Sequence, residues 1–447
     1  MEVLEVPLKP FAEALGLPMD MFKALFSILA CIPLGWVQCF FIKSETPGLV
    51  YSLVVGLALA VLQYDFSGLQ VFFVTSVLVY LILLFVKRDR VGFLVAVVSF
   101  STLSYMHIDR MLKDWMGWKI DASGLQMMAT LKFISLAFCY QDGTKQRTNP
   151  NEIPQGSRAY AVESLPSLLE YYSYLCSYGG FCIGPFSEYA DYIRYIKRKS
   201  VFSHIPSPIK ASLIRMVQGL ALMSVYLATI GMFDPFYCAT EEFAAKSLLF
   251  KSYYMIGLYV NLEGKYFGGW KLAEAALVAT GLSYSGKDWE RCIGIRCLPM
   301  WTSLTLKPMV DSWNISVTMW LRKYIYFRVI SAYPKARALA QFATLMASAF
   351  WHGFYPAYYI FFINIFFLND LVGMVVSRNF KVPWPVKVLA GLAMHYCLLV
   401  IGLAFLTLGF YECIKSYAAF NFVPLMAVYS LWVVFKLLPR VKGTKAD

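Results

Sequence analysis

One histidine in this chain stands where a titratable ring is unexpected. His352 lies in the stretch FWHGFYPAYY (350–359), among aromatic and small apolar residues. A neutral imidazole, with an ordinary pKa of about 6.5, can remove the proton of a hydroxyl group as that group attacks. Trp351 precedes it, Gly353 follows it, and Pro356 limits the continuation of a helix. The alternative is a structural histidine that only packs against its neighbours.

The other three histidines have simpler interpretations. His107 lies at the end of an apolar run, where we expect an interfacial histidine. His204 stands in the polar loop SHIPSPIK, where we expect it to be solvated. His395 lies in the middle of the apolar run LAMHYCLLV, where a hydrogen bond to a neighbouring helix is expected. His352 is therefore the candidate catalytic histidine.

A second polar candidate, Asn314, begins an amphipathic segment. Apolar residues recur at spacings of three and four within SWNISVTMWLRKYIYFR (312–328), which predicts an amphipathic helix. Its basic residues Arg322, Lys323 and Arg328 stand among aromatic ones, a composition typical of a helix on a membrane surface. An asparagine side chain can donate a hydrogen bond to a developing oxyanion. The alternative is a polar residue that only caps or faces the helix.

These residues must be positioned by a membrane protein. The chain is 59% hydrophobic and 15% charged, with a mean hydropathy of +0.57, whereas a soluble domain is about 45–50% apolar and about 25% charged. Runs of about 20 apolar residues recur along its whole length. We predict an all-α, polytopic bundle of about eleven transmembrane helices. The predicted spans are 21–42, 48–64, 67–86, 91–108, 123–140, 211–232, 244–262, 338–351, 354–376, 386–409 and 419–438.

Two further apolar segments are irregular. The segment 166–187 is interrupted by glycines and a proline, and the segment 266–282 is short and carries Lys271 and Glu274. Irregular backbone at membrane depth is tolerated only where protein or a water-filled cavity satisfies it. We therefore expect the first segment to be re-entrant or interfacial and to line an internal chamber.

The distribution of basic residues predicts the orientation. The loops 87–90 and 194–199 and the tail 436–447 are rich in Lys and Arg, so we expect all three to be cytosolic. Two clear spans between the loops return the chain to the same side, so 166–187 is not expected to cross. The acidic N-terminal segment 1–20 is then lumenal.

Charge and cysteine content narrow the class of protein. The net charge is +13, but the basic residues lie in loops between spans, so we expect membrane lipids or phosphorylated ligands rather than nucleic acid as partners. Ten cysteines are scattered through the chain, and the pair Cys292 and Cys297 has no second pair to complete a metal site. Neither a metal nor an organic prosthetic group is expected.

Three stretches taken together resemble the membrane-bound O-acyltransferase family. They are WHGFYPAYY, WNISVTMWLR and YLCSYGGFCIGPFSEY, and the resemblance extends from about Leu131 to the last spans. In that family a histidine in a W-H-G context and an upstream asparagine form the catalytic pair, which falls here on His352 and Asn314. The resemblance implies one membrane-embedded domain over 1–447. One departure is Ala357, where many members have glycine.

Two stretches look like the lysophospholipid acyltransferases of that family, namely LKFISLAFCYQDG (131–143) and LPSLLEYYSYLCSYGGFCIGPFSEY (165–189). The resemblance implies an acyl-CoA-dependent O-acyltransferase of the endoplasmic reticulum membrane that re-esterifies lysophospholipids, with acyl-CoA as co-substrate and no tightly bound cofactor. Family members that act on diacylglycerol, a sterol or a protein are alternatives. A transporter is an alternative of a different class, but it would be expected to show internal repeats. Neither the residues nor the resemblance indicates the headgroup preference, the acyl preference or the oligomeric state.

Substrate contacts are expected on both sides of the candidate pair. The basic residues of 312–328 would attract the phosphates of acyl-CoA at the cytosolic surface, and the glycine-rich residues would line the path of the acyl chain. The predicted substrate-binding residues are Trp313, Trp320, Arg322, Lys323, Trp351, Tyr178, Gly179, Gly180, Gly184 and Pro185.

Overall fold

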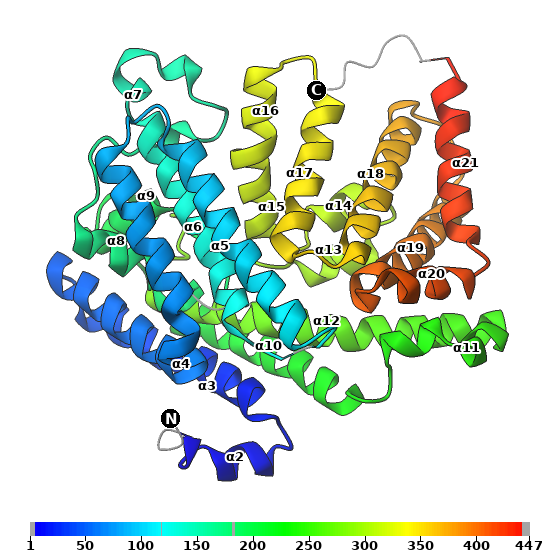
Figure 1. Cartoon of the computed structure of the whole chain (residues 1–447), viewed down its shortest axis with the longest axis horizontal. Helices are drawn as coiled ribbons and strands as arrows, with labels where there is room; N and C mark the ends of the chain where they lie inside the picture. The colour runs from blue at the N-terminus through cyan, green and yellow to red at the C-terminus, as the bar shows by residue number, and fades with distance from the viewer. Residues whose placement is uncertain (1–4, 118, 181–183, 440–447) are drawn as a thin grey trace. The chain divides into compact units, whose positions relative to one another are not determined.

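The protein is helical throughout the part that the structure describes. The computed structural model describes residues 5–117, 119–180 and 184–439, and every regular element in these ranges is a helix (Figure 1). Part of the expected cytosolic tail, 440–447, and the first four residues of the expected lumenal segment lie outside these ranges. The chain forms two compact units. Unit 1 comprises Met1–Ala221, Phe267–Ile295 and Asn314–Pro334. Unit 2 comprises Leu222–Tyr266, Arg296–Trp313 and Lys335–Asp447.

The described residues contain seven helices that are long and apolar enough to cross a membrane. They are α3 (Met19–Phe41), α4 (Glu45–Phe85), α5 (Val91–Lys113), α6 (Ala122–Asp142), α10 (Ile209–Thr229), α18 (Pro356–Ser377) and α19 (Trp384–Thr407). A further pair, α20 (Phe410–Ala418) and α21 (Val423–Leu437), is bent by 87° and would make an eighth span. The prediction of an all-helical, polytopic membrane protein is confirmed.

The individual spans differ from the predicted eleven in four places. The predicted spans 48–64 and 67–86 both fall in α4, which is kinked at Asp65, where φ is 63° and ψ is 166°. The predicted span 338–351 is α17 (Arg337–His352), which has only 16 residues. The predicted span 419–438 is mostly α21, preceded by a break at which Phe422 is left-handed.

The fourth difference is that the predicted span 244–262 and the irregular segment 266–282 form one helix, α12 (Leu248–Thr280). The two charged residues that made the second segment look irregular are paired with each other. Nζ of Lys271 lies 2.7 Å from Oε2 of Glu274, one helical turn away. Because residues three apart share a helix face, this pairing favours the helix instead of ending it.

Helix α6 lies at the centre of unit 1. Of its most apolar 18-residue stretch, 83% of the residues are buried, against 33% in α5, so α6 is surrounded by other parts of the unit. Polar side chains of α6 are buried as well, among them Gln126 and Lys132. Around it lie α8 (Leu168–Leu175), α9 (Tyr189–Ile196) and a rod of three consecutive helices. The rod consists of α15 (Ile315–Leu321), the π-helix η6 (Arg322–Tyr326) and α16 (Phe327–Ala332). The predicted amphipathic helix 312–328 is therefore helical from residue 315 onward.

The irregular segment 166–187 contains only short helices. Ser167 and Glu170 form a capping box that starts α8, which ends after eight residues, far short of the about 20 needed to span a bilayer. The 3₁₀-helix η3 (Tyr178–Gly180) follows, and residues 181–183 lie outside the described ranges. The described part of this segment is thus not a spanning helix, as predicted. The side of the membrane on which the segment lies stays a prediction.

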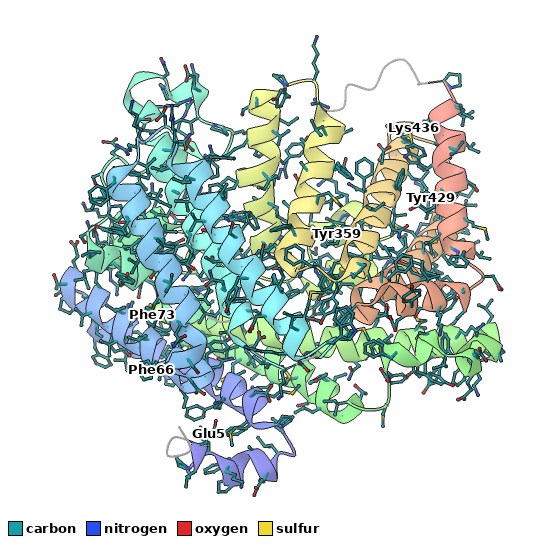
Figure 2. All side chains as sticks on the ribbon, in the orientation of Figure 1. Glu5, Phe66, Phe73, Tyr359, Tyr429 and Lys436 are labelled. Carbon is teal, nitrogen blue, oxygen red and sulfur yellow. The ribbon has the colours of Figure 1, made fainter. Side chains whose placement is uncertain are left out.

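Unit 2 is built from α17 to α21 with the first part of α12. Side-chain contacts join α21 to α18: the Tyr429 hydroxyl donates to Oδ1 of Asn364 over 2.8 Å, and Nζ of Lys436 lies 2.9 Å from Asp370. Figure 2 labels Tyr429 and Lys436 on α21. The core of this unit is formed by residues such as Phe243, Met255, Leu403 and Tyr417. The two polar contacts join the helices α18 and α21.

Short helices make up most of the remaining ordered structure. They are α2 (Lys9–Ala14), α7 (Lys145–Thr148), η1 (Pro150–Glu152), η2 (Arg158–Tyr160), η4 (Ser200–Ser203), η5 (Pro235–Ala239), α11 (Glu241–Ala245), α13 (Cys297–Thr302) and α14 (Leu306–Val310).

Candidate active site

His352 is the last residue of α17, and the chain reverses directly after it. Gly353 has φ 126° and ψ −162°, a backbone region that is essentially restricted to glycine. Its N–H donates to the Ala349 carbonyl over 3.1 Å and so closes the helix. Helix α18 then begins at Pro356, whose fixed φ suits a first helical residue. The W-H-G-x-x-P pattern therefore builds a helix end, a reversal and a new helix start, with the imidazole at the corner.

Aromatic rings pack around the His352 imidazole. Phe405 of α19 meets it edge to face, with ring centroids 4.9 Å apart, and Phe362 of α18 stacks on it at 5.8 Å. Tyr358 lies at 5.8 Å and Trp351 at 4.8 Å. The imidazole is half-buried among these rings. Such packing restricts the orientation of the ring, which is what a positioned proton acceptor requires.

Ala357, the departure from the family pattern, fits the local backbone. It lies in the first turn of α18 with its methyl group fully buried. Alanine is the most favourable residue in a helix. Its N–H donates over 3.2 Å to the carbonyl of Leu408, where the chain leaves α19 with φ at 59°. The alanine is therefore compatible with the corner that holds His352.

Asn314 precedes α15 in a left-handed conformation, with φ 39° and ψ 53°. Asparagine adopts this conformation more readily than most residues. Among the described residues its side chain makes no capping hydrogen bond to the first turn of the helix. Instead, the backbone is held from the next residue, since the Ile315 N–H donates to the Gly294 carbonyl over 2.8 Å. The amide side chain is thus not used as a helix cap.

Three stretches that were singled out in the sequence meet inside unit 1. The Trp320 indole N–H donates to the Leu131 carbonyl over 3.0 Å, which joins 312–328 to 131–143. The Phe186 N–H donates to the Ser316 hydroxyl over 3.0 Å, which joins 165–189 to the first turn of α15. The stretch 312–328, which contains Asn314, is therefore hydrogen-bonded to both 131–143 and 165–189.

A buried ion pair strengthens the same junction. Nζ of Lys323 lies 2.5 Å from Oε1 of Glu188 and 3.7 Å above the centre of the Tyr160 ring, and the Tyr324 hydroxyl donates to Oε2 of Glu188. Burial disfavours the ammonium form, but the Glu188 carboxylate and Tyr160 outweigh it and raise the pKa of Lys323. Lys323 is therefore a charged group held inside unit 1.

The glycine-broken segment is tightly folded on itself. A Cβ atom added at Gly184 would lie 2.6 Å from the Cα atom of Gly180 and 2.8 Å from the carbonyl oxygen of Gly179. Because these neighbours are backbone atoms, no side chain can move aside to make room. Pro185 is buried beside them. Glycine at 184 is thus required by close backbone approach.

The predicted substrate-binding residues are divided between the two units. Trp313 and Trp351 belong to unit 2, with Trp351 buried against His352. Trp320 is buried in unit 1 with its indole N–H already bonded to Leu131, whereas Arg322 is exposed. The Tyr178 hydroxyl donates to Gln38 of α3 over 2.7 Å. Their contact with substrate stays a prediction.

His395 and His204 have the surroundings expected of them, whereas the interfacial position of His107 stays a prediction. Nε2 of His395 lies 2.8 Å from the Ser303 carbonyl oxygen, so this ring bonds to a neighbouring segment of unit 2. His204 is exposed, with Nδ1 3.2 Å from the Ser203 hydroxyl. His107 is buried near the end of α5.

Three buried charged residues were missed as parts of this architecture. They are Lys132, Glu188 and Glu274. Lys132 donates to the carbonyls of Tyr174 and Leu175 over 3.0 Å each, at the C-terminal end of α8, where a cation is favoured. For Lys132 the available signal was a lone charge within an apolar run, because such charges are rarely placed at membrane depth without a role.

The chain is similar in sequence to a known family and to several known proteins. The profile of the family described as MBOAT, membrane-bound O-acyltransferase family, matches residues 81–390. Similar proteins include "Lysophospholipid acyltransferase 2" of Arabidopsis thaliana, which is 26% identical over 98% of this chain and 97% of that protein. "Membrane-bound glycerophospholipid O-acyltransferase 2" of Mus musculus is 30% identical over 84% and 75%, respectively. "Lysophospholipid acyltransferase" of Schizosaccharomyces pombe is 22% identical over 98% and 91%.

The matched region contains Asn314, the W-H-G corner at His352 and all of the predicted substrate-binding residues. It covers more than half of the chain, and the likeness to the plant and fission yeast proteins extends over nearly the whole length of both partners. The chain therefore belongs to the membrane-bound O-acyltransferase family.

Proposed function

We propose that this protein transfers an acyl group from acyl-CoA to the free hydroxyl of a lysophospholipid. Family membership supports an O-acyltransferase, and the names of the plant, mouse and yeast relatives support a glycerophospholipid or lysophospholipid acceptor. The observation that carries the proposal is the position of His352. It is held at a helix end by a glycine-only reversal and packed among aromatic rings.

In the proposed reaction, His352 accepts the proton of the lysolipid hydroxyl as the hydroxyl oxygen attacks the thioester carbonyl. The C–S bond then breaks, coenzyme A leaves as a thiolate, and the proton held by His352 neutralises that thiolate. The products are the diacyl phospholipid and free coenzyme A. Positioned proton transfer of this kind contributes about 10²–10⁴-fold to the rate.

Asn314 has a different role in this proposal. Negative charge develops on the carbonyl oxygen of the thioester during attack, and the side-chain amide of Asn314 donates a hydrogen bond to it. An asparagine in such a position typically contributes about 10²–10³-fold. The support for this role is that the amide is not used to cap α15 and that its backbone is anchored on neighbouring segments.

The finer membrane arrangement is part of the proposal. The basic loops favour a cytosolic C-terminus and a lumenal N-terminus, and the family resemblance favours the endoplasmic reticulum and about eleven spans around an internal chamber. The rod α15–α16 would then meet acyl-CoA at the cytosolic surface, with the exposed Arg322 near its phosphates. Acyl-CoA is a co-substrate here, and no tightly bound cofactor is needed for the chemistry.

A panel assay tests the proposed function. Purified protein is given oleoyl-CoA or arachidonoyl-CoA with lysolipids that carry choline, ethanolamine, serine or inositol, and the His352→Ala variant serves as the control. We expect acyl transfer to at least one lysolipid and none in the control. Transfer to diacylglycerol or a sterol with no turnover of any lysolipid would overturn the choice of acceptor.

A further inference from the structure

A buried carboxylate in α12 is connected to the backbone of Asn314 through a single peptide group. Oε1 of Glu274 accepts the N–H of Ile295 over 3.1 Å, and the carbonyl of the same peptide, that of Gly294, accepts the N–H of Ile315 over 2.8 Å. Ile315 directly follows Asn314. All of these residues belong to unit 1. The Glu274 carboxylate therefore fixes the peptide group that holds the backbone next to Asn314.

The contact is reinforced at Gly294. Its own N–H also donates to Oε1 of Glu274, over 2.8 Å. A Cβ atom at position 294 would lie 3.1 Å from Cβ of Trp270 and 3.6 Å from Oε1 of Glu274, so the chain runs close against α12 here. Two hydrogen bonds and this close approach leave the 294–295 peptide little freedom to move or rotate.

The carboxylate is itself held in place. Its second oxygen, Oε2, lies 2.7 Å from Nζ of Lys271 and 3.4 Å from Nε of Arg215 in α10. Lys271 also donates to the Ile295 carbonyl over 2.9 Å. Glu274 is completely buried, and a buried charge persists only where it is paired and hydrogen-bonded in this way. Glu274 and its partner Lys271 therefore both bond to the same short backbone segment, Gly294–Ile295.

Asn314 depends on that backbone. Its left-handed conformation is uncommon for a residue other than glycine, and among the described residues its side chain makes no capping bond that would orient it. Its direction is therefore set by the backbone on either side, and on the C-terminal side by the Ile315 N–H and the Gly294 carbonyl. A shift of this carbonyl would turn the amide away from its direction.

We infer that Glu274 is a positioning residue that aims the Asn314 side chain during acyl transfer. The inference rests on the proposed role of Asn314. A misplacement of a reacting group by about 1 Å can cost about 10²-fold in rate. Glu274 does not need to touch either substrate, so its loss should change kcat and leave KM for acyl-CoA and for the lysolipid unchanged.

The test is a double-variant cycle on the full-length protein, with kcat and both KM values measured. Glu274→Gln should lower kcat by about 10–100-fold. In an Asn314→Ala background the same change should have almost no further effect, because no amide remains to be aimed. Independent losses that multiply, a rise in KM with normal kcat, or an unchanged kcat in Glu274→Gln would each overturn the inference.

A second variant covers the case in which Glu274→Gln does not fold. Gly294→Ala adds one methyl group against Trp270 and keeps every charge, and it should lower kcat in the same selective way. The matched control is Glu263→Gln. Glu263 is a carboxylate of the same helix, α12, which accepts the indole N–H of Trp301 over 2.8 Å and makes no contact with 294–295 among those that the structure describes. It should keep kcat in the folded protein.

The outcomes separate this inference from the proposed function. A normal kcat in Asn314→Ala would remove Asn314 from the reaction and overturn the roles of both Asn314 and Glu274, while acyl transfer with His352 as the base would stand. A low kcat in Asn314→Ala together with a normal kcat in Glu274→Gln and in Gly294→Ala would overturn only the role of Glu274.

Discussion

Nζ of Lys323 lies 2.5 Å from Oε1 of Glu188, and the two side chains are 13% and 8% exposed. The pair joins the glycine-rich stretch 165–189 to the rod that begins at Asn314. Arg322, which precedes Lys323 in the sequence, is exposed, and its guanidinium carbon lies 5.4 Å from the centre of the Phe327 ring. Two adjacent cations that look alike in the sequence are thus expected to act differently, one on stability and the other on substrate capture.

Lys323→Met should lower the free energy of unfolding by about 3–5 kcal/mol, because Glu188 would remain as a buried carboxylate without its cation. Thermal unfolding in detergent measures the effect as a lower Tm. The control is Lys323→Met combined with Glu188→Gln, which leaves neither charge and should recover part of the loss. An unchanged Tm in the single variant would show that the pair contributes nothing to stability.

Arg322→Gln should leave Tm nearly unchanged and raise KM for acyl-CoA by about fivefold at low salt, since one surface charge is worth on the order of 1 kcal/mol towards an anionic ligand. The difference from the wild type should shrink as salt is added, because exposed charges are screened. Initial rates at several salt concentrations measure it. A KM that does not respond to the substitution at any salt would exclude Arg322 from acyl-CoA binding.

His352→Ala should abolish acyl transfer and leave the protein folded, because the proton acceptor is lost while the surrounding rings remain. Turnover is measured on monodisperse protein. His395→Ala is the matched control: its ring bonds to the Ser303 carbonyl within unit 2, so most of the activity should remain. The reverse pattern would mean that the base is His395.

Asn314→Ala should lower kcat by about 10²–10³-fold with little change in KM for acyl-CoA, because a donor to the developing oxyanion acts only in the transition state. Steady-state kinetics and Tm are measured on the same preparation. A lowered Tm with normal kcat would instead identify Asn314 as a structural residue of the α15 start.

Cysteines introduced at Gln155 and at Lys199 should be labelled from the same, cytosolic, face, because the segment between them is expected to return to its own side. Both positions are exposed. A membrane-impermeant thiol reagent on sealed microsomes, in a variant without the ten native cysteines, measures the accessibility. Labelling from opposite faces would show that the segment 166–187 crosses the bilayer.

The sequence alone determined the class of the molecule and the local shape of its most informative motif. Long apolar runs predicted the membrane helices because apolarity over about 20 residues is a property of a single segment. The corner at His352 was also predictable, since Gly353 and Pro356 impose their backbone preferences on their immediate neighbours. Span boundaries were less certain: α4 is kinked, not divided, at Asp65, and α12 continues through charges that looked disruptive.

Only the tertiary structure decided which distant residues meet. Trp320 and Leu131 are 189 residues apart, and Ser316 and Phe186 are 130 apart, yet each pair shares a hydrogen bond. Nothing in the sequence near Glu274 indicates that its carboxylate holds the peptide next to Asn314. The physical reason is that periodicity and turn residues act through the local backbone, whereas the partner of a buried polar group is chosen by how whole helices pack.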